Sequence, residues 1–173
     1  MRVINFFGGP GAGKSTKAAE LFADMKKAGY SVELVTEYFK ELVWENTAKQ
    51  TTDYLYVLAN QNRRLERLRN KVDYIITDCP LLLIGYYSLV NNGRHYDIVN
   101  KLSHTLFNTY PNINFFIKSL RDGYTLNDRI HDKIEAEIID QQLIDILVSY
   151  NYDYRVVKDT YKIVFTDLYS RGK

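Results

Sequence analysis

The 173-residue chain has few of the residues that build cross-links and zinc sites. It contains one cysteine, Cys79, and three histidines that lie far apart in the sequence. A single thiol cannot form a disulfide within the chain, and no spacing of cysteine and histidine resembles a zinc motif. These absences exclude an internal disulfide scaffold and a zinc-stabilised domain.

Long apolar runs are also lacking, and neither sign of charge dominates. The first apolar run, residues 3–7, is too short for a membrane span or a signal-peptide core. We therefore expect no membrane contact and a cytoplasmic location, or the host cytoplasm if the source is viral. The formal net charge is +2, so charge alone does not predict nucleic-acid binding, although basic residues can still cluster locally.

Proline is scarce, with 3 residues, and glycine gathers mainly at residues 8–13. The chain shows no internal repeat, no low-complexity segment and no linker. Its length is close to that of one domain, and hydrophobic residues make up 46% of it, enough to bury a core. We predict a single domain over residues 1–173.

Strand patterns alternate with helical patterns along the chain. Strands are expected at residues 3–7, 31–36, 73–78, 113–117 and 154–157. Helices are expected at residues 15–28, 51–72, 81–90, 95–110 and 129–150, the last with Ile130, Ile134, Ile138, Ile146 and Tyr150 near one face. Such alternation predicts an α/β fold, in which helices cover both faces of a parallel sheet.

One glycine-rich motif lies between the first expected strand and the first expected helix. Its residues are Gly8, Gly9, Pro10, Gly11, Ala12, Gly13, Lys14 and Ser15, followed by Thr16. They match G-x-x-x-x-G-K-[ST], a Walker A loop, in which glycines let successive backbone N–H groups point at phosphate oxygens. The helix N-terminus adds a favourable dipole, and Lys14 can reach the β- and γ-phosphates. The motif predicts that the chain binds ATP or a close relative.

Two oxygen-bearing side chains are candidate magnesium ligands. The Ser15 hydroxyl belongs to the loop, and Asp78 ends the third expected strand. In P-loop proteins a serine and a strand-end acid at these places hold Mg²⁺. We therefore expect ATP and Mg²⁺ as the cofactors.

Two classes of nucleotide hydrolase lack their usual residues here. A GTPase usually carries Asn-Lys-x-Asp, whereas the nearest string is Val156-Val157-Lys158-Asp159. An ATPase motor often has a glutamate directly after the strand-end aspartate, but Cys79 and Pro80 follow Asp78. With no evident residue to activate water, the pattern favours phosphate transfer to another molecule.

Three further side chains are catalytic candidates. Glu37 stands at the carboxyl end of the second expected strand, where ligands of open α/β sheets bind, and is a candidate general base or substrate contact. Arg121 and Arg129 bracket a polar segment after the fourth strand and are candidates for a lid that stabilises the transferred phosphate. The sequence does not choose between the two arginines.

The helix expected at residues 51–72 carries two polar features. Gln61 lies on its apolar face, where it would either read a base edge or bond to the backbone. Its end is basic, and such a run is usually a solvated face, although it can also meet an anionic substrate. The basic residues are Arg63, Arg64, Arg67, Arg69 and Lys71.

With these motifs the chain resembles the small P-loop nucleoside and nucleotide kinases over most of its length. The resemblance implies a three-layer P-loop NTPase fold with strand order 2-3-1-4-5, a short lid after the fourth strand, and an acceptor pocket formed by helices after strands two and three. Stretches 7–16, 32–38 and 72–80 also resemble phage-type members of the thymidylate kinase superfamily. These include nicotinamide-riboside kinase domains and phage kinases that phosphorylate 5-hydroxymethyluracil in DNA.

Glu37, Trp44 and Gln61 together resemble the deoxynucleoside kinases, which implies that Glu37 serves as base and that Gln61 reads the nucleobase. The expected substrate contacts are Glu37, Tyr38, Trp44 and Gln61. The leading hypothesis is an ATP-dependent kinase acting on a hydroxyl of a nucleoside, a nucleotide or a hydroxymethylated pyrimidine in DNA. A nucleoside-monophosphate kinase and an ATP-dependent switch or slow ATPase stay open as alternatives. DNA as a partner also stays open, and so does the oligomeric state, for which a homodimer is one option.

Overall fold

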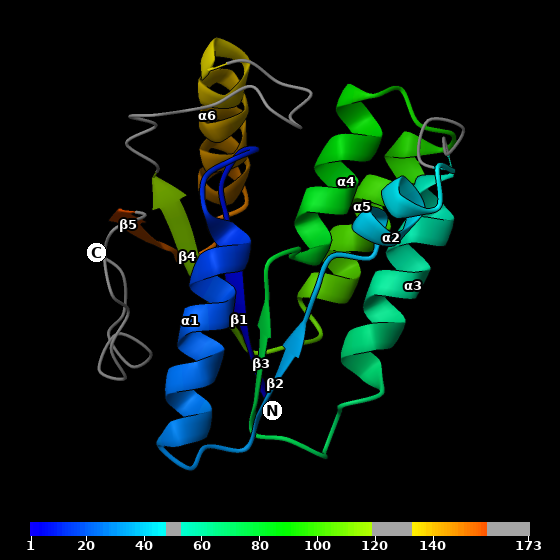
Figure 1. Cartoon of the computed structure of the whole chain (residues 1–173). Coiled ribbons are helices and arrows are strands. Elements are labelled where there is room, and N and C mark those ends of the chain that lie inside the picture. The colour runs from blue at the N-terminus through cyan, green and yellow to red at the C-terminus, as the bar shows by residue number, and fades with distance from the viewer. Residues whose placement is uncertain (48–52, 119–132, 159–173) are drawn as a thin grey trace.

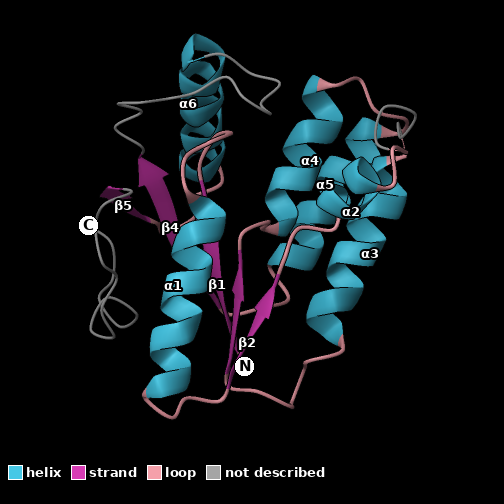
Figure 2. Ribbon diagram, viewed as in Figure 1, coloured by secondary structure: helices cyan, strands magenta, loops and turns pink. Residues whose placement is uncertain are grey.

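The computed structural model describes residues 1–47, 53–118 and 133–158. Five strands and six helices alternate along these residues (Figures 1 and 2). The strands are β1 (Arg2–Phe7), β2 (Val32–Val35), β3 (Tyr74–Thr77), β4 (Asn112–Lys118) and β5 (Arg155–Lys158). The helices are α1 (Lys14–Lys27), α2 (Phe39–Trp44), α3 (Tyr54–Glu66), α4 (Leu81–Val90), α5 (Tyr96–Phe107) and α6 (Lys133–Ser149).

The five strands form one parallel sheet in the order β2-β3-β1-β4-β5. This confirms the order 2-3-1-4-5 that the family resemblance implied. The most central strand, β1, pairs with β3 on one side and with β4 on the other. Because all strands are parallel, the segments that leave their carboxyl ends meet at one edge of the sheet.

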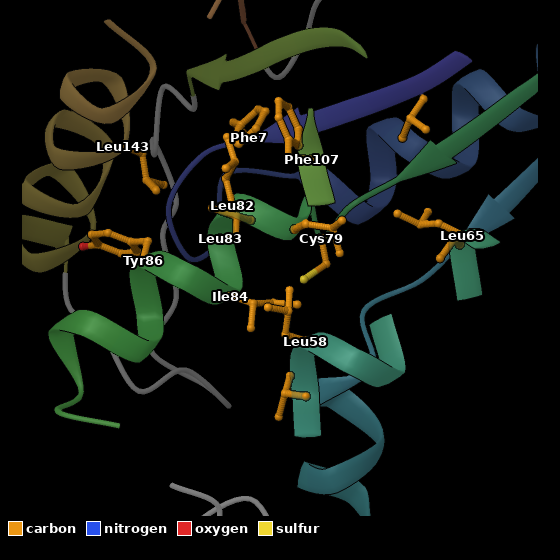
Figure 3. Packing of buried hydrophobic residues seen from close by; sticks show 14 of the residues in the cluster. Phe7, Leu58, Leu65, Cys79, Leu82, Leu83, Ile84, Tyr86, Phe107 and Leu143 are labelled. Carbon is orange, nitrogen blue, oxygen red and sulfur yellow. The ribbon is translucent and has the colours of Figure 1, made fainter. Parts of the chain in front are cut away.

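Helices cover both faces of the sheet, as predicted. Alternation along β1 sends Ile4 and Phe6 into a core beneath α1 and sends Val3 and Phe7 into a second core. The second core is built from α3, α4, α5 and α6, and Figure 3 shows Leu58, Leu83, Phe107 and Leu143 of these helices gathered around it. Each large apolar side chain that is fully buried contributes about 1.5–3 kcal/mol relative to leaving it exposed. Packing in the two cores holds the strands in place, and with them the segments that leave the carboxyl ends of the strands.

The long helix predicted at residues 51–72 is shorter in the structure. It begins at Tyr54, where the Asp53 side chain accepts a hydrogen bond from the backbone N–H of Tyr56. It ends at Glu66, and Asn70 then adopts a left-handed backbone conformation with φ of 60°. The short helix α2 was not predicted, because six residues are too few to show a helical period.

The buried face of α6 differs from the prediction. Ile134 and Ile138 are 68% and 52% exposed, whereas Ile139, Leu143 and Leu147 are buried. Both stripes have helical spacing, so periodicity alone could not choose between them. The buried stripe is the one that packs against the core of α3, α4 and α5.

None of the helices in the described part of the chain is long and apolar enough to cross a membrane.

Candidate active site

The glycine-rich motif forms the turn between β1 and α1, the context that the sequence predicted. Gly8 has φ of 140°, and a Cβ added to it would lie 2.8 Å from the carbonyl oxygen of Ile117 on β4. Gly13, which precedes α1, has φ of 87°. A side chain at either position would meet backbone strain, and at Gly8 a clash as well. Glycine is therefore required for the loop to curl over the end of β1.

A cavity of about 660 Å³ opens at the carboxyl ends of the strands. One wall is the phosphate loop and the start of α1, residues 10–16. Gly8 and Gly9 are buried and do not belong to this wall. The opposite wall comes from α2, α3, α4 and the turn after α4, through Phe39, Tyr54, Val57, Leu83, Tyr87 and Asn91. Glu37, Lys40 and Asp78 also line the cavity.

Lys14 lies folded against its own loop. Its Nζ donates hydrogen bonds to the carbonyl oxygens of Gly8 at 2.8 Å and Gly9 at 3.0 Å. Desolvation lowers the pKa of the Lys14 ammonium, and the negative charges of Glu37 and Asp78 oppose that shift. A polyphosphate bound at the loop would give this desolvated ammonium a direct anionic partner.

Ser15 and Asp78 are in direct contact. The Ser15 hydroxyl donates to Oδ2 of Asp78 at 2.5 Å, and Asp78 is only 3% exposed. Among the described residues, Oδ1 of Asp78 is buried without a hydrogen-bond partner. Mg²⁺ takes oxygen ligands and is usually held by one or two carboxylates, substrate phosphates and waters. The Ser15 hydroxyl and the Asp78 carboxylate, with its unsatisfied Oδ1, therefore fit a magnesium ion at this place.

Lys40 is a site residue that sequence reasoning missed. Its Nζ lies 2.7 Å from Oγ of Ser15, 3.1 Å from Oδ2 of Asp78 and 4.0 Å from Oε2 of Glu37. The only signal in the sequence was its place three residues after Glu37, which becomes informative once residues 39–44 are known to be helical. Glu37 lies just before this helix and Lys40 in its first turn, and both line the same cavity.

Glu37 lines the same cavity from the segment that leaves β2. Burial raises the pKa of its carboxyl group, against the opposing effect of the Lys14 and Lys40 charges. A carboxylate with a raised pKa is a better proton acceptor than an ordinary surface glutamate. Its position and basicity suit the predicted role of general base.

A second residue that the sequence did not single out is Asp140 of α6. Its Oδ1 accepts a hydrogen bond from the backbone N–H of Gly9 at 2.5 Å. This contact ties the outer part of the phosphate loop to α6, a helix more than 120 residues away in the chain. No local pattern marked Asp140, because its partner is a backbone group set only by the tertiary fold.

Three of the predicted substrate contacts take other positions. Gln61 is completely buried: its Oε1 accepts from the backbone N–H of Tyr38, and its Nε2 donates to the carbonyl of Thr36. These contacts are those expected from the second of the two interpretations left open, hydrogen bonding to the backbone. The Tyr38 hydroxyl bonds to that of Tyr56, which raises the pKa of Tyr38 to about 12, and Trp44 is 75% exposed. Neither side chain belongs to the cavity wall that the described residues form, so their substrate contacts stay predictions.

The remaining wall of the cavity is apolar and aromatic. The rings of Phe39 and Tyr54 are nearly parallel, with centroids 6.5 Å apart and an interplanar angle of 5°. The Tyr54 hydroxyl accepts a hydrogen bond from Nδ2 of Asn91 at 2.8 Å. Burial raises the pKa of the Tyr87 hydroxyl, which therefore stays protonated. This wall can bind a flat apolar body and offer a few neutral polar groups at its edge.

The predicted lid arginines, Arg121 and Arg129, lie outside the described residues. The basic end of α3 is partly neutralised, because Arg64 pairs with Glu41 and Arg69 pairs with Glu66. This pairing supports the interpretation of the run as a solvated face.

Comparison with solved structures identifies the fold. Thymidylate kinase from Ehrlichia chaffeensis is 20% identical with a TM-score of 0.65, and the match covers 97% of this chain and 92% of that one. Deoxyadenosine kinase from M. mycoides, solved with dCMP and dCDP, is 20% identical with a TM-score of 0.56, covering 96% of this chain and 95% of that one. The chain therefore has a P-loop kinase-like fold.

Sequence comparison gives the family. No curated protein matches the chain. The family model described as an AAA domain matches residues 3–162, which is most of the sequence. The chain therefore belongs to the AAA domain family.

Proposed function

We propose that this protein is an ATP-dependent phosphotransferase that moves the γ-phosphate of ATP to a hydroxyl group of a nucleoside-like acceptor. One observation carries the proposal. A single cavity is lined by the phosphate loop and by an apolar, aromatic surface, and Glu37 lines the same cavity. A nucleotide hydrolase needs only the first wall, whereas a kinase needs both.

The chemistry follows from the positions of these groups. Glu37 accepts the proton of the acceptor hydroxyl, whose oxygen forms a bond to the γ-phosphorus. The bond from that phosphorus to the β–γ bridging oxygen breaks, and ADP leaves. The backbone N–H groups of the loop and Lys14 bind the phosphates and stabilise the charge that develops on them. Mg²⁺ held by Ser15 and Asp78 would supply further charge neutralisation.

The charge of the cavity favours a hydroxyl acceptor over a phosphate acceptor. Among the described residues that line the cavity, the basic side chains are Lys14 and Lys40. Lys14 contacts the loop carbonyls and Lys40 contacts Ser15 and Asp78, so both lie on the donor side. The wall of Phe39, Tyr54 and Tyr87 is neutral and would stack on a base. A nucleoside fits this wall better than a nucleoside monophosphate does.

Three finer acceptors belong to the same proposal. A nucleotide can be phosphorylated at a free hydroxyl if its own phosphate stays outside the cavity. A hydroxymethylated pyrimidine of DNA, the acceptor of phage 5-hydroxymethyluracil DNA kinases, would have to leave the base stack to enter. Nicotinamide riboside, a nucleoside with a flat ring, meets the same requirements.

An acceptor panel tests the proposal. ATP labelled in its γ-phosphate is incubated with the protein, Mg²⁺ and, in turn, nucleosides, nicotinamide riboside, nucleoside monophosphates and hydroxymethyluracil DNA. We expect label in the phosphate ester of a hydroxyl acceptor. Label in a nucleoside diphosphate would show a monophosphate kinase, and label only in free phosphate with every acceptor would contradict the kinase proposal.

A further inference from the structure

The Lys40 ammonium occupies a particular place in the site. Its two shortest contacts are Oγ of Ser15 at 2.7 Å and Oδ2 of Asp78 at 3.1 Å. Both oxygens belong to the two side chains that fit a magnesium ion, whereas Oδ1 of Asp78 has no hydrogen-bond partner among the described residues. The ammonium therefore stands where a divalent cation would find its protein ligands.

A divalent cation bound to these oxygens would lie within a few ångströms of the Lys40 ammonium. At separations of a few ångströms, like charges repel strongly in a site that is partly shielded from water. We propose that Lys40 is a tethered cation that pairs with Asp78 and Ser15, and that a divalent metal ion binds there only by displacing it. Lys40 thereby sets the strength of metal binding.

The surroundings of Lys40 allow such a displacement. The Lys40 side chain is 39% exposed, whereas Asp78 is 3% exposed. Rotation of the flexible lysine stem can therefore withdraw the ammonium while the backbone stays in place. The helix α2 that carries it is held independently, by burial of Leu42 and by the ion pair between Glu41 and Arg64.

The fold also gives a reason for a cation at this place. A buried carboxylate without a partner is costly, because desolvation is then not offset by an opposite charge. Lys40 supplies that charge to Asp78. After displacement, Glu37 remains an acidic neighbour for the ammonium, since it already lies 4.0 Å away. The acids of the site thus keep a cation beside them before and after metal binding.

The proposal predicts how metal affinity responds to mutation. The apparent affinity of a site falls by the fraction of molecules in which the site is competent. If Lys40 engages Asp78 in about nine molecules out of ten, its removal tightens metal binding about tenfold. The inference rests on the metal ligands named in the proposed function, but its test measures metal binding and not phosphate transfer.

The experiment is a titration of the full chain with Mn²⁺ in the absence of nucleotide, with free Mn²⁺ measured by electron paramagnetic resonance. We expect Lys40→Met and Lys40→Gln to bind Mn²⁺ about tenfold more tightly than the wild type. The matched control is Lys26→Met, which removes a lysine from the surface ion pair with Glu33 and should leave the affinity unchanged. Unchanged or weaker binding in both Lys40 variants would overturn the proposal.

Two further measurements distinguish a misassigned metal site from a metal ion that binds without displacing Lys40. Asp78→Asn should weaken Mn²⁺ binding in the wild type and in the Lys40→Gln background alike. If it does not, the metal site itself is misassigned, whatever the acceptor panel shows. In thermal unfolding, Mn²⁺ should raise the Tm of Lys40→Gln more than that of the wild type, because the variant has lost the cation that paired with Asp78. An equal rise would contradict displacement.

Discussion

The phosphate-loop wall of the cavity is one continuous stretch, residues 10–16, whereas the opposite wall is assembled from α2, α3, α4 and the turn after α4. The first wall binds through backbone N–H groups whose directions are set by glycine conformations such as that of Gly13. The second binds through side chains brought together by packing. The phosphate-binding wall is therefore specified locally by a sequence motif, whereas the acceptor wall depends on the tertiary fold.

The largest effect is expected on the donor wall. Lys14→Ala removes the ammonium that reaches the β- and γ-phosphates, and turnover should fall on the order of 10³-fold. Nucleotide affinity should fall as well, measured by calorimetric titration with ATP and Mg²⁺. The control is Lys26→Ala, on the same helix but in a surface ion pair. Equal turnover in the two variants would show that the Lys14 ammonium does not contribute to phosphate transfer.

A smaller effect on turnover is expected from substitution of Glu37, which also lines the cavity. Glu37→Gln keeps the shape but removes the proton acceptor, so kcat should fall about 10²-fold while ATP affinity changes little. The matched control is Glu33→Gln on β2, outside the cavity wall. A kcat that stays at the wild-type level would favour an acceptor that is already a phosphate and needs no base.

Glu37 also predicts a pH dependence of stability. Its folded pKa is raised above the ordinary value of 4.5, so its stabilising contribution is complete below pH 4.5 and is lost as the pH rises through the folded pKa. Glu37→Gln should therefore lack this loss and should unfold at pH 7 at a temperature no lower than the wild type. A clear fall in the Tm of the variant at pH 7 would show that the ionised carboxylate stabilises the fold.

The smallest effect on activity is expected on the acceptor wall. Phe39→Ala removes one of the two nearly parallel rings, and KM for the acceptor should rise about tenfold, the loss of roughly 1.4 kcal/mol of aromatic contact. The KM for ATP should stay the same. Steady-state kinetics with each substrate varied in turn measures both. A rise in the KM for ATP alone would place Phe39 on the donor side.

Gln61 provides the contrast to Phe39. Gln61→Leu leaves the backbone N–H of Tyr38 without its partner, and the free energy of unfolding should fall by about 1–3 kcal/mol. Because Gln61 is completely buried, the ratio of kcat/KM between two acceptors should not change. A changed ratio would indicate that Gln61 contacts the base of the acceptor, although its hydrogen bonds to the backbone argue against that role.

The same division explains what the sequence predicted. The glycine spacing and the strand-end acid predicted the loop, Ser15, Asp78 and Glu37, because each follows from a local pattern next to a strand. Lys40, Asp140 and Asn91 were missed, because their partners lie far away in the chain and are set by packing. Gln61 was ambiguous for the same reason, since only the fold shows that backbone groups of the segment after β2 lie within its reach.

A pulse and chase on the wild-type protein tests the proposed phosphate transfer most directly. The protein is first mixed with γ-labelled ATP and Mg²⁺, and then with buffer or with the acceptor found in the panel. We predict that the label stays in ATP until the acceptor is added and that it then moves to the hydroxyl of the acceptor. Release of the label as free phosphate at the same rate with and without acceptor would contradict this prediction.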